Sequence, residues 1–101
     1  MQSKQFNTIV GNTLSHCTDT LCNKAKEYST EDRLHNFKVA ASIQNITPIQ
    51  ALCGMMAKHT VSVYDMCQSG TYSSDMWDEK IGDSINYLLL LRALVQDNET
   101  T

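Results

Sequence analysis

The sequence predicts an all-α protein, a four-helix antiparallel bundle, and three observations lead to this prediction. Apolar residues recur at steps of three or four over most of the 101 residues, the chain has a single Pro, and no segment alternates convincingly as a strand would. The length suits one modest hydrophobic core. We therefore predict one domain over residues 1–96, followed by a polar, frayed tail over residues 97–101.

The first helix is predicted over residues 4–27. Its apolar residues keep the spacing of one helical face, and they are Phe6, Val10, Leu14, Cys17, Leu21, Ala25 and Tyr28. Gly11 and several Thr residues lower the intrinsic helix propensity of this segment. We expect this helix to depend on packing for its stability.

Capping signals predict where the second and third helices begin. Ser29 stands three residues before Asp32, as in a capping box, and the helix that starts there should end near residues 44–45. Thr47 can cap a helix, and Pro48 lacks the N–H group that would otherwise be unsatisfied. The third helix carries a broad apolar face made of Leu52, Met55, Met56, His59, Val63, Met66 and Cys67.

The fourth helix is predicted from Asp75 to Val95 without interruption, with Gly82 as its weakest point. Residues 68–74 read as the preceding turn, with Ser73 or Ser74 as the cap. An apolar stripe holds its phase along the helix through Ile81, Ile85, Leu88, Leu91 and Val95. Four helices from so short a chain leave a thin core, which predicts a homo-oligomer.

Composition argues against several classes of protein. The net charge of −3 disfavours a nucleic-acid binder, and no apolar run is long enough to span a membrane. The N-terminus lacks the apolar run of a signal peptide, so we predict a soluble cytoplasmic protein with reduced thiols. The four cysteines form no Cys-x-x-Cys pair and have no His at zinc-finger spacing, which disfavours a zinc site.

A polar row on the fourth helix is the main indication of function. Glu79, Asp83 and Asn86 recur at i, i+4 and i+7 beside the apolar stripe. Carboxylates at such a boundary lose hydration unless a cation meets them, and Mg²⁺ is one natural partner. The helix dipole alone would account for Glu79 in an early turn. Asp83 and Asn86 lie deep in the helix, where both residue types have poor propensity, which favours a polar site.

Other candidate residues lie on the second, third and fourth helices. They are Glu31, Asp32, Arg33, Asn36, Lys58, His59 and Tyr87. Each has an ordinary alternative: Asp32 can cap a helix, Lys58 can be a solvated surface residue, and His59 a hydrogen-bonded histidine at the core boundary. Tyr87 could stack on a base or simply pack. No Gly-rich phosphate loop and no recognisable nucleophile motif is present.

At these positions the chain resembles a known family. The segments 26–37, 58–59 and 83–88 are similar to small phage and prophage proteins related to the MazG-like all-α nucleotide pyrophosphohydrolases. The resemblance covers about residues 24–95. Its most specific parts are Tyr28 with Glu31 and Asp32, Asn36 with Phe37, and the group Asp83, Asn86 and Tyr87.

The resemblance implies metal-dependent nucleotide chemistry. In that superfamily, acidic residues on two helices bind Mg²⁺, which holds a nucleoside triphosphate while an activated water splits off pyrophosphate. Asp83 matches the aspartate that closes the second acidic motif. The glutamate three residues earlier falls at Lys80, and Glu79 would have to substitute for it. The first motif, two glutamates three residues apart, is not found, since Glu27 and Glu31 are four apart.

Three hypotheses follow. The first is a Mg²⁺-dependent nucleotide pyrophosphohydrolase, with Glu79 and Asp83 catalytic. Its metal ligands would be Glu31, Asp32, Glu79 and Asp83, and its nucleotide-binding residues Arg33, Asn36, Lys58, His59, Asn86 and Tyr87. The second is a protein that sequesters a nucleotide signal of host defence, in the host cytoplasm if phage-encoded. The third is a helical protein-interaction module. Lys80 favours binding over turnover, because a positive charge opposes a second cation.

Overall fold

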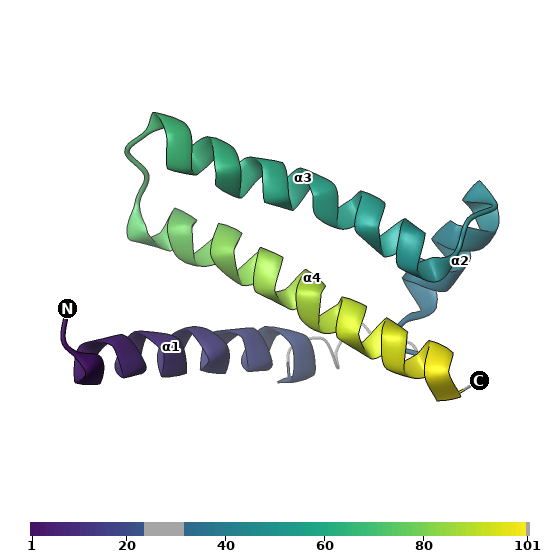
Figure 1. Cartoon of the computed structure of the whole chain (residues 1–101), viewed down its shortest axis with the longest axis horizontal. Coiled ribbons are helices and arrows are strands. Elements are labelled where there is room, and N and C mark those ends of the chain that lie inside the picture. Colours follow the sequence, from purple (N-terminus) through teal and green to yellow (C-terminus); the bar gives the residue numbers. More distant parts are fainter. Residues whose placement is uncertain (24–31, 101) are drawn as a thin grey trace.

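The computed structural model describes residues 1–23 and 32–100. Four α-helices account for most of these residues: α1 (Ser3–Thr18), α2 (His35–Gln44), α3 (Pro48–Ser69) and α4 (Ser74–Thr100) (Figure 1). A π-helical turn, η1 (Asp19–Asn23), continues α1. The described part of the chain contains no strand, which confirms the all-α prediction. None of its helices is long and apolar enough to cross a membrane.

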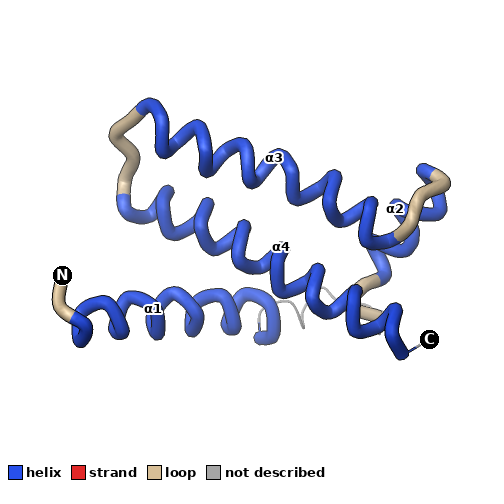
Figure 2. Tube along the Cα trace, in the orientation of Figure 1, coloured by secondary structure: helices blue, strands red, loops and turns tan. Residues whose placement is uncertain are grey.

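The three long helices lie in a row with α4 in the middle. Figures 1 and 2 show α3 on one side of α4 and α1 on the other. The helices α3 and α4 form an antiparallel hairpin, whereas α1 runs in the same direction as α4. The short α2 crosses the end of the row near the C-terminus of α4. The molecule is therefore a row of three long helices with one short helix at its end, which differs from the expected bundle of four alternating helices.

Local capping accounts for the start of α3 and α4. The Thr47 hydroxyl accepts the Gln50 N–H at 3.1 Å, and the Gln50 side chain accepts the Thr47 N–H at 3.0 Å, a complete capping box before Pro48. Ser73 caps α4, because its hydroxyl accepts the Met76 N–H at 3.2 Å. The predicted starts of these two helices are confirmed. So is the continuity of α4 through Gly82.

Other helix boundaries differ from the predictions. The α-helical part of α1 ends at Thr18, and residues 24–27 of the predicted first helix lie outside the described residues. The predicted cap Ser29 also lies outside them, and α2 begins only at His35. The Asp32 carboxylate accepts the Leu34 N–H at 3.0 Å, so Asp32 forms a turn before the helix. At the other end of the chain, α4 continues to Thr100, into the region expected to fray.

The hydrophobic core lies where α2, α3 and α4 meet. Phe37, Leu52 and Leu94 are buried there, and partly buried apolar side chains surround them, namely Leu34, Ile49, Met55, Met56, Tyr87, Leu90 and Leu91. From α1 only Cys17 is buried, with its Sγ 4.0 Å from the Gly82 carbonyl oxygen. Burial raises the pKa of the Cys17 thiol. The core is thus concentrated at one end of the row, and α1 contributes little to it.

Candidate functional site

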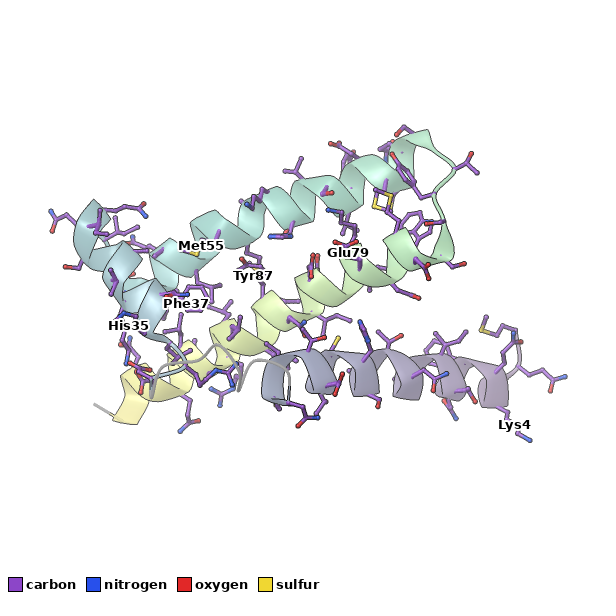
Figure 3. All side chains as sticks on the ribbon, turned by 180° about the vertical axis from the view of Figure 1, so that it is seen from behind. Lys4, His35, Phe37, Met55, Glu79 and Tyr87 are labelled. Atoms are coloured by element: carbon purple, nitrogen blue, oxygen red, sulfur yellow. The ribbon has the colours of Figure 1, made fainter. Side chains whose placement is uncertain are left out.

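A cluster of three polar or aromatic side chains joins α3 to α4, and we call it the His59 cluster: His59, Asp83 and Tyr87. The His59 Nδ1 atom lies 3.8 Å from an Asp83 carboxylate oxygen. The His59 and Tyr87 rings are 4.8 Å apart and tilted by 33°. Asp83 and Tyr87 are four residues apart on α4, so both reach the same imidazole from one helical face. Figure 3 shows Tyr87 between the two helices.

Asn86 adds an unsatisfied acceptor beside this cluster. Its side-chain oxygen Oδ1 is buried and has no hydrogen-bond partner among the described residues, and the same holds for the Ser84 hydroxyl. A buried polar atom without a partner costs about 1–3 kcal/mol. Asn86 and Ser84 are two residues apart, which separates their directions by about 200° around α4. The two atoms therefore belong to different sides of the helix, and only Asn86 shares a side with Glu79 and Asp83.

Two further predicted residues lie at the edge of the cluster. Glu79 is exposed one turn before Asp83 on α4 (Figure 3). Lys58 is exposed and precedes His59 on α3. Neither forms an ion pair within the part of the chain that the structure describes. An exposed carboxylate and an exposed ammonium group thus lie on the two helices that carry the His59 cluster, a set suited to a charged, polar ligand.

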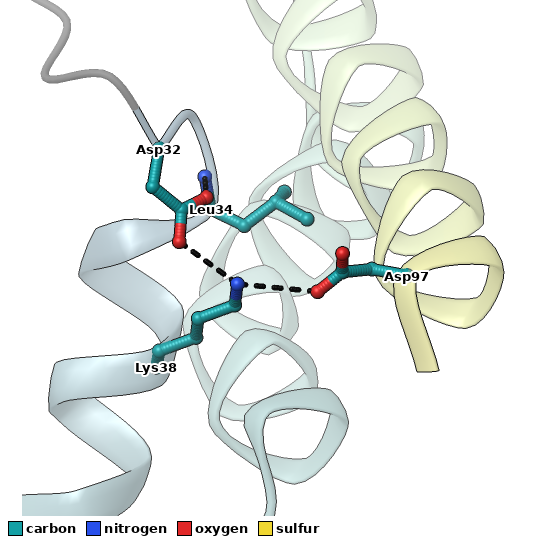
Figure 4. A network of polar contacts seen from close by, with 4 residues as sticks. All are labelled: Asp32, Leu34, Lys38 and Asp97. Carbon is teal, nitrogen blue, oxygen red and sulfur yellow. Dashed lines mark hydrogen bonds and ion pairs between the residues drawn. The ribbon is translucent and has the colours of Figure 1, made fainter. Parts of the chain in front are cut away.

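Asp32 belongs to a different part of the molecule (Figure 4). Its carboxylate lies 2.8 Å from the Lys38 ammonium, which lies 3.1 Å from the Asp97 carboxylate near the end of α4. The hydrogen bond from Lys38 lowers the pKa of Asp32, and the bonds to Asp32 and Asp97 raise the pKa of Lys38. Asp97 follows Asp83 by 14 residues, which is about 21 Å along an α-helix. The structure therefore does not bring Asp32 together with Asp83.

The remaining predicted residues lie near Asp32 or outside the described chain. Arg33 donates a hydrogen bond of 2.8 Å to the Leu21 carbonyl oxygen at the end of α1. Asn36 is exposed in the first turn of α2. Glu31 lies outside the described residues. Of the ten predicted site residues, only those on α3 and α4 come together.

An apolar hollow of about 340 Å³ lies between Arg33 and α4. The α4 residues that line it are Leu89, Leu90 and Ala93, and its other lining residues are Leu21, Cys22, Asp32, Arg33 and Leu34. Leu90 and Ala93 follow Asn86 by four and seven residues, so they continue the Asn86 side of the helix. The hollow is thus a mainly apolar surface that begins about one helical turn beyond Asn86.

The described carboxylates do not complete a Mg²⁺ site. No three His, Cys, Asp or Glu side chains lie close enough together to hold a metal ion in residues 1–23 and 32–100. Glu79 and Asp83 offer two carboxylates, which suffices only where the phosphates of a ligand supply further oxygens to the cation. The acidic set that the family resemblance implies for hydrolysis is not assembled by these residues.

Sequence reasoning missed the roles of Lys38 and Asp97. The Asp32–Lys38 pair spans six residues, which is not a helical pair spacing, because Asp32 lies in the turn before α2. Asp97 approaches Lys38 only through the tertiary fold. The spacing of charged residues carried no signal for either contact.

Comparison of the chain with protein-family models, with curated proteins and with solved structures finds no match. The resemblance to the MazG-like superfamily therefore stays a prediction that rests on the residues named above.

Proposed function

We propose that this protein binds a nucleotide on the side of α4 that carries Glu79, Asp83 and Asn86. The observation that carries the proposal is the buried, unsatisfied Oδ1 of Asn86 next to the His59 cluster. An amide oxygen accepts hydrogen bonds from N–H groups, and the exocyclic amino and ring N–H groups of nucleobases are such donors. A bound base that donates to Asn86 would remove the cost of leaving this oxygen unpaired.

The neighbouring groups suit the rest of a nucleotide. The Asp83 carboxylate lies on the Nδ1 side of His59, which leaves the Nε2 atom as the ring nitrogen available to a ligand. Lys58 is a solvent-directed cation one residue away, and lysine binds phosphate as a point charge. The apolar hollow one turn beyond Asn86 offers a surface for the face of a base.

The arrangement of the carboxylates favours nucleotide binding without rapid hydrolysis. Asp32 is paired with Lys38, which also pairs with Asp97 near the end of α4, and neither ion pair involves Asp83. Lys80 occupies the position at which the resemblance places a glutamate. With two carboxylates near the cluster, the described residues lack the acidic set that would hold a cation and activate water.

The test is titration calorimetry of a nucleotide panel with and without Mg²⁺, with products and retained ligand separated by chromatography. We expect a retained, unchanged nucleotide and at least a tenfold weaker affinity in Asp83→Asn, which keeps shape and removes charge. Asp65→Asn, an exposed carboxylate on α3, is the matched control and should bind as the wild type does. Release of pyrophosphate would identify an enzyme instead, and no binding by any form would reject the nucleotide proposal.

We also propose that the protein self-associates. Its accessible surface is 7436 Å², whereas a compact monomer of this mass exposes about 5,700 Å². Its radius of gyration is 15.6 Å, against about 13 Å for a compact chain of this length. The excess surface of about 1,700 Å² exceeds the roughly 800 Å² per partner that a standard interface buries.

A further inference from the structure

We propose that the apolar stripe of α1 is the surface on which a second copy of the chain docks. The stripe consists of Phe6, Ile9, Val10 and Leu14, which share one helical face and are 57%, 46%, 39% and 50% exposed. In a protein with so small a core, four large apolar side chains on one helix are left half in water. The proposal rests on the self-association proposed above and does not depend on nucleotide binding.

The position of α1 in the fold explains why the stripe is uncovered. Figures 1 and 2 place α1 at the edge of the row, with α4 as its only long neighbour. A groove of about 340 Å³ runs between α1 and α4, and Ile9 and Ile81 line it together with the polar residues Asn12, Thr13, His16 and Asp78. Domains normally bury apolar helix faces between two packed layers. In this protein no second layer of helices covers the apolar stripe of α1 within the described residues.

The local sequence of α1 gives a separate reason to expect a cover. Its N-cap residue, Gln2, makes no side-chain cap, and the first turn contains no acidic residue. Gly11 and the β-branched residues Thr8, Ile9 and Val10 lower its propensity further. A 16-residue helix of this kind is marginal without tertiary packing.

A second copy fits this surface better than another class of partner. A two-fold axis would set the stripe against itself, which pairs apolar with apolar surface, and the excess area is large enough for an interface of standard size on each copy. Within Ser3–Thr18 the only basic residues are Lys4 and His16, and no Asp or Glu is present. This near-neutral helix lacks the basic cluster that nucleic acid or an anionic membrane surface attracts.

Sedimentation equilibrium over a wide concentration range tests the proposal. We expect the wild type to sediment as a multiple of 11.3 kDa, and Leu14→Glu to shift to the monomer mass. The control is Val61→Glu, an exposed apolar residue on α3 (57% exposed), which should retain the wild-type mass. A monomeric wild type at every concentration would overturn the proposal, as would Leu14→Glu with unchanged mass.

A second measurement covers the case in which Leu14→Glu loses helical structure. In Leu14→Cys, the rate of thiol alkylation at position 14 is followed by peptide mass spectrometry, which separates it from the exposed Cys22, Cys53 and Cys67. We expect alkylation to slow several-fold as protein concentration rises through the association range. A rate that is independent of concentration while the mass increases would place the interface elsewhere and reject α1 as the docking surface.

Discussion

At the scale of single residues, the molecule leaves the Asn86 side-chain oxygen unsatisfied beside the His59 cluster, which joins α3 to α4. Most buried polar atoms in folded proteins have a partner, so each exception calls for an explanation. The Asn86 oxygen lies on the side of α4 that also carries Asp83, and a ligand donor would explain it. The Ser84 hydroxyl is equally buried and lies on another side, which makes it an internal comparison.

We predict that Asn86→Leu stabilises the free protein by about 1 kcal/mol and abolishes ligand binding. Replacing an unpaired buried polar group by an apolar one removes its desolvation cost. Thermal unfolding should show the gain as a rise of about 4–8 °C for a domain of this size. Ser84→Ala should also unfold no earlier than the wild type, yet keep its affinity. Loss of affinity in both variants would contradict the assignment of the binding site to the side of α4 that carries Asn86.

The sequence predicts the parts of this site that depend on spacing within one helix, and it does not predict the contacts between helices. The i, i+4, i+7 spacing is local, so it correctly placed Glu79, Asp83 and Asn86 on one face of a helix. The approach of His59 to Asp83 required α3 and α4 to pair in one register, which a sequence pattern does not specify. Only the family resemblance groups Asp32 with Asp83. In the structure Asp32 pairs instead with Lys38.

At the scale of helices, the same distinction holds. The starts of α3 and α4 were predictable because Thr47, Pro48 and Ser73 act on backbone groups within three residues. The start of α2 at His35 was not, because Asp32 can serve equally in a capping box or in a turn before the helix, and its spacing from Ser29 does not show that its carboxylate accepts the Leu34 N–H. The relative direction of the helices could not be predicted either. The apolar periodicity of α1 does not specify whether α1 packs parallel or antiparallel to α4.

We predict that Thr47→Ala lowers the free energy of unfolding by about 1 kcal/mol, because it removes the hydroxyl that accepts the Gln50 N–H, while the backbone N–H that donates to the Gln50 side chain remains. Chemical denaturation monitored by circular dichroism measures the change. Thr71→Ala, an exposed threonine in the turn between α3 and α4, is the control and should leave the midpoint unchanged. An equal effect of both substitutions would mean that the cap contributes nothing.

The Asp32–Lys38–Asp97 network predicts a pH dependence of the contact between α2 and α4. Because the pKa of Asp32 is lowered in the folded state, its contribution is present above the ordinary aspartate pKa and is lost as pH falls through the lowered value. Because the pKa of Lys38 is raised, its contribution is lost only as pH rises through that raised value. The network therefore operates across the neutral range.

We expect Lys38→Met to unfold slightly earlier than the wild type at pH 7, and to approach it only as pH falls below the ordinary aspartate pKa of about 3.9 and through the lowered pKa of Asp32. Thermal melts from pH 3 to pH 7 provide the measurement. The effect should be small, because the three side chains are 40–46% exposed. A constant difference between the two proteins at every pH would assign the effect to lost packing of the lysine stem.

At the scale of the whole molecule, stability depends on the end of the row where α2, α3 and α4 meet. Leu52 is completely buried there. We predict that Leu52→Ala costs about 2–5 kcal/mol, a large share of the 5–15 kcal/mol that holds a typical domain together. Urea denaturation would measure the loss. Ile43→Ala, at a position 80% exposed on α2, should change stability by less than about 0.5 kcal/mol.

The place of Cys17 in the fold bears on the order in which the chain folds. Its contact with Gly82 spans 65 residues of sequence, whereas α3 and α4 are joined by a short turn and can pair as soon as both exist. Closing a long loop costs more entropy than closing a short one, and α1 recovers little of that cost by burial. The hairpin of α3 and α4 with α2 should therefore form first, and α1 should dock last.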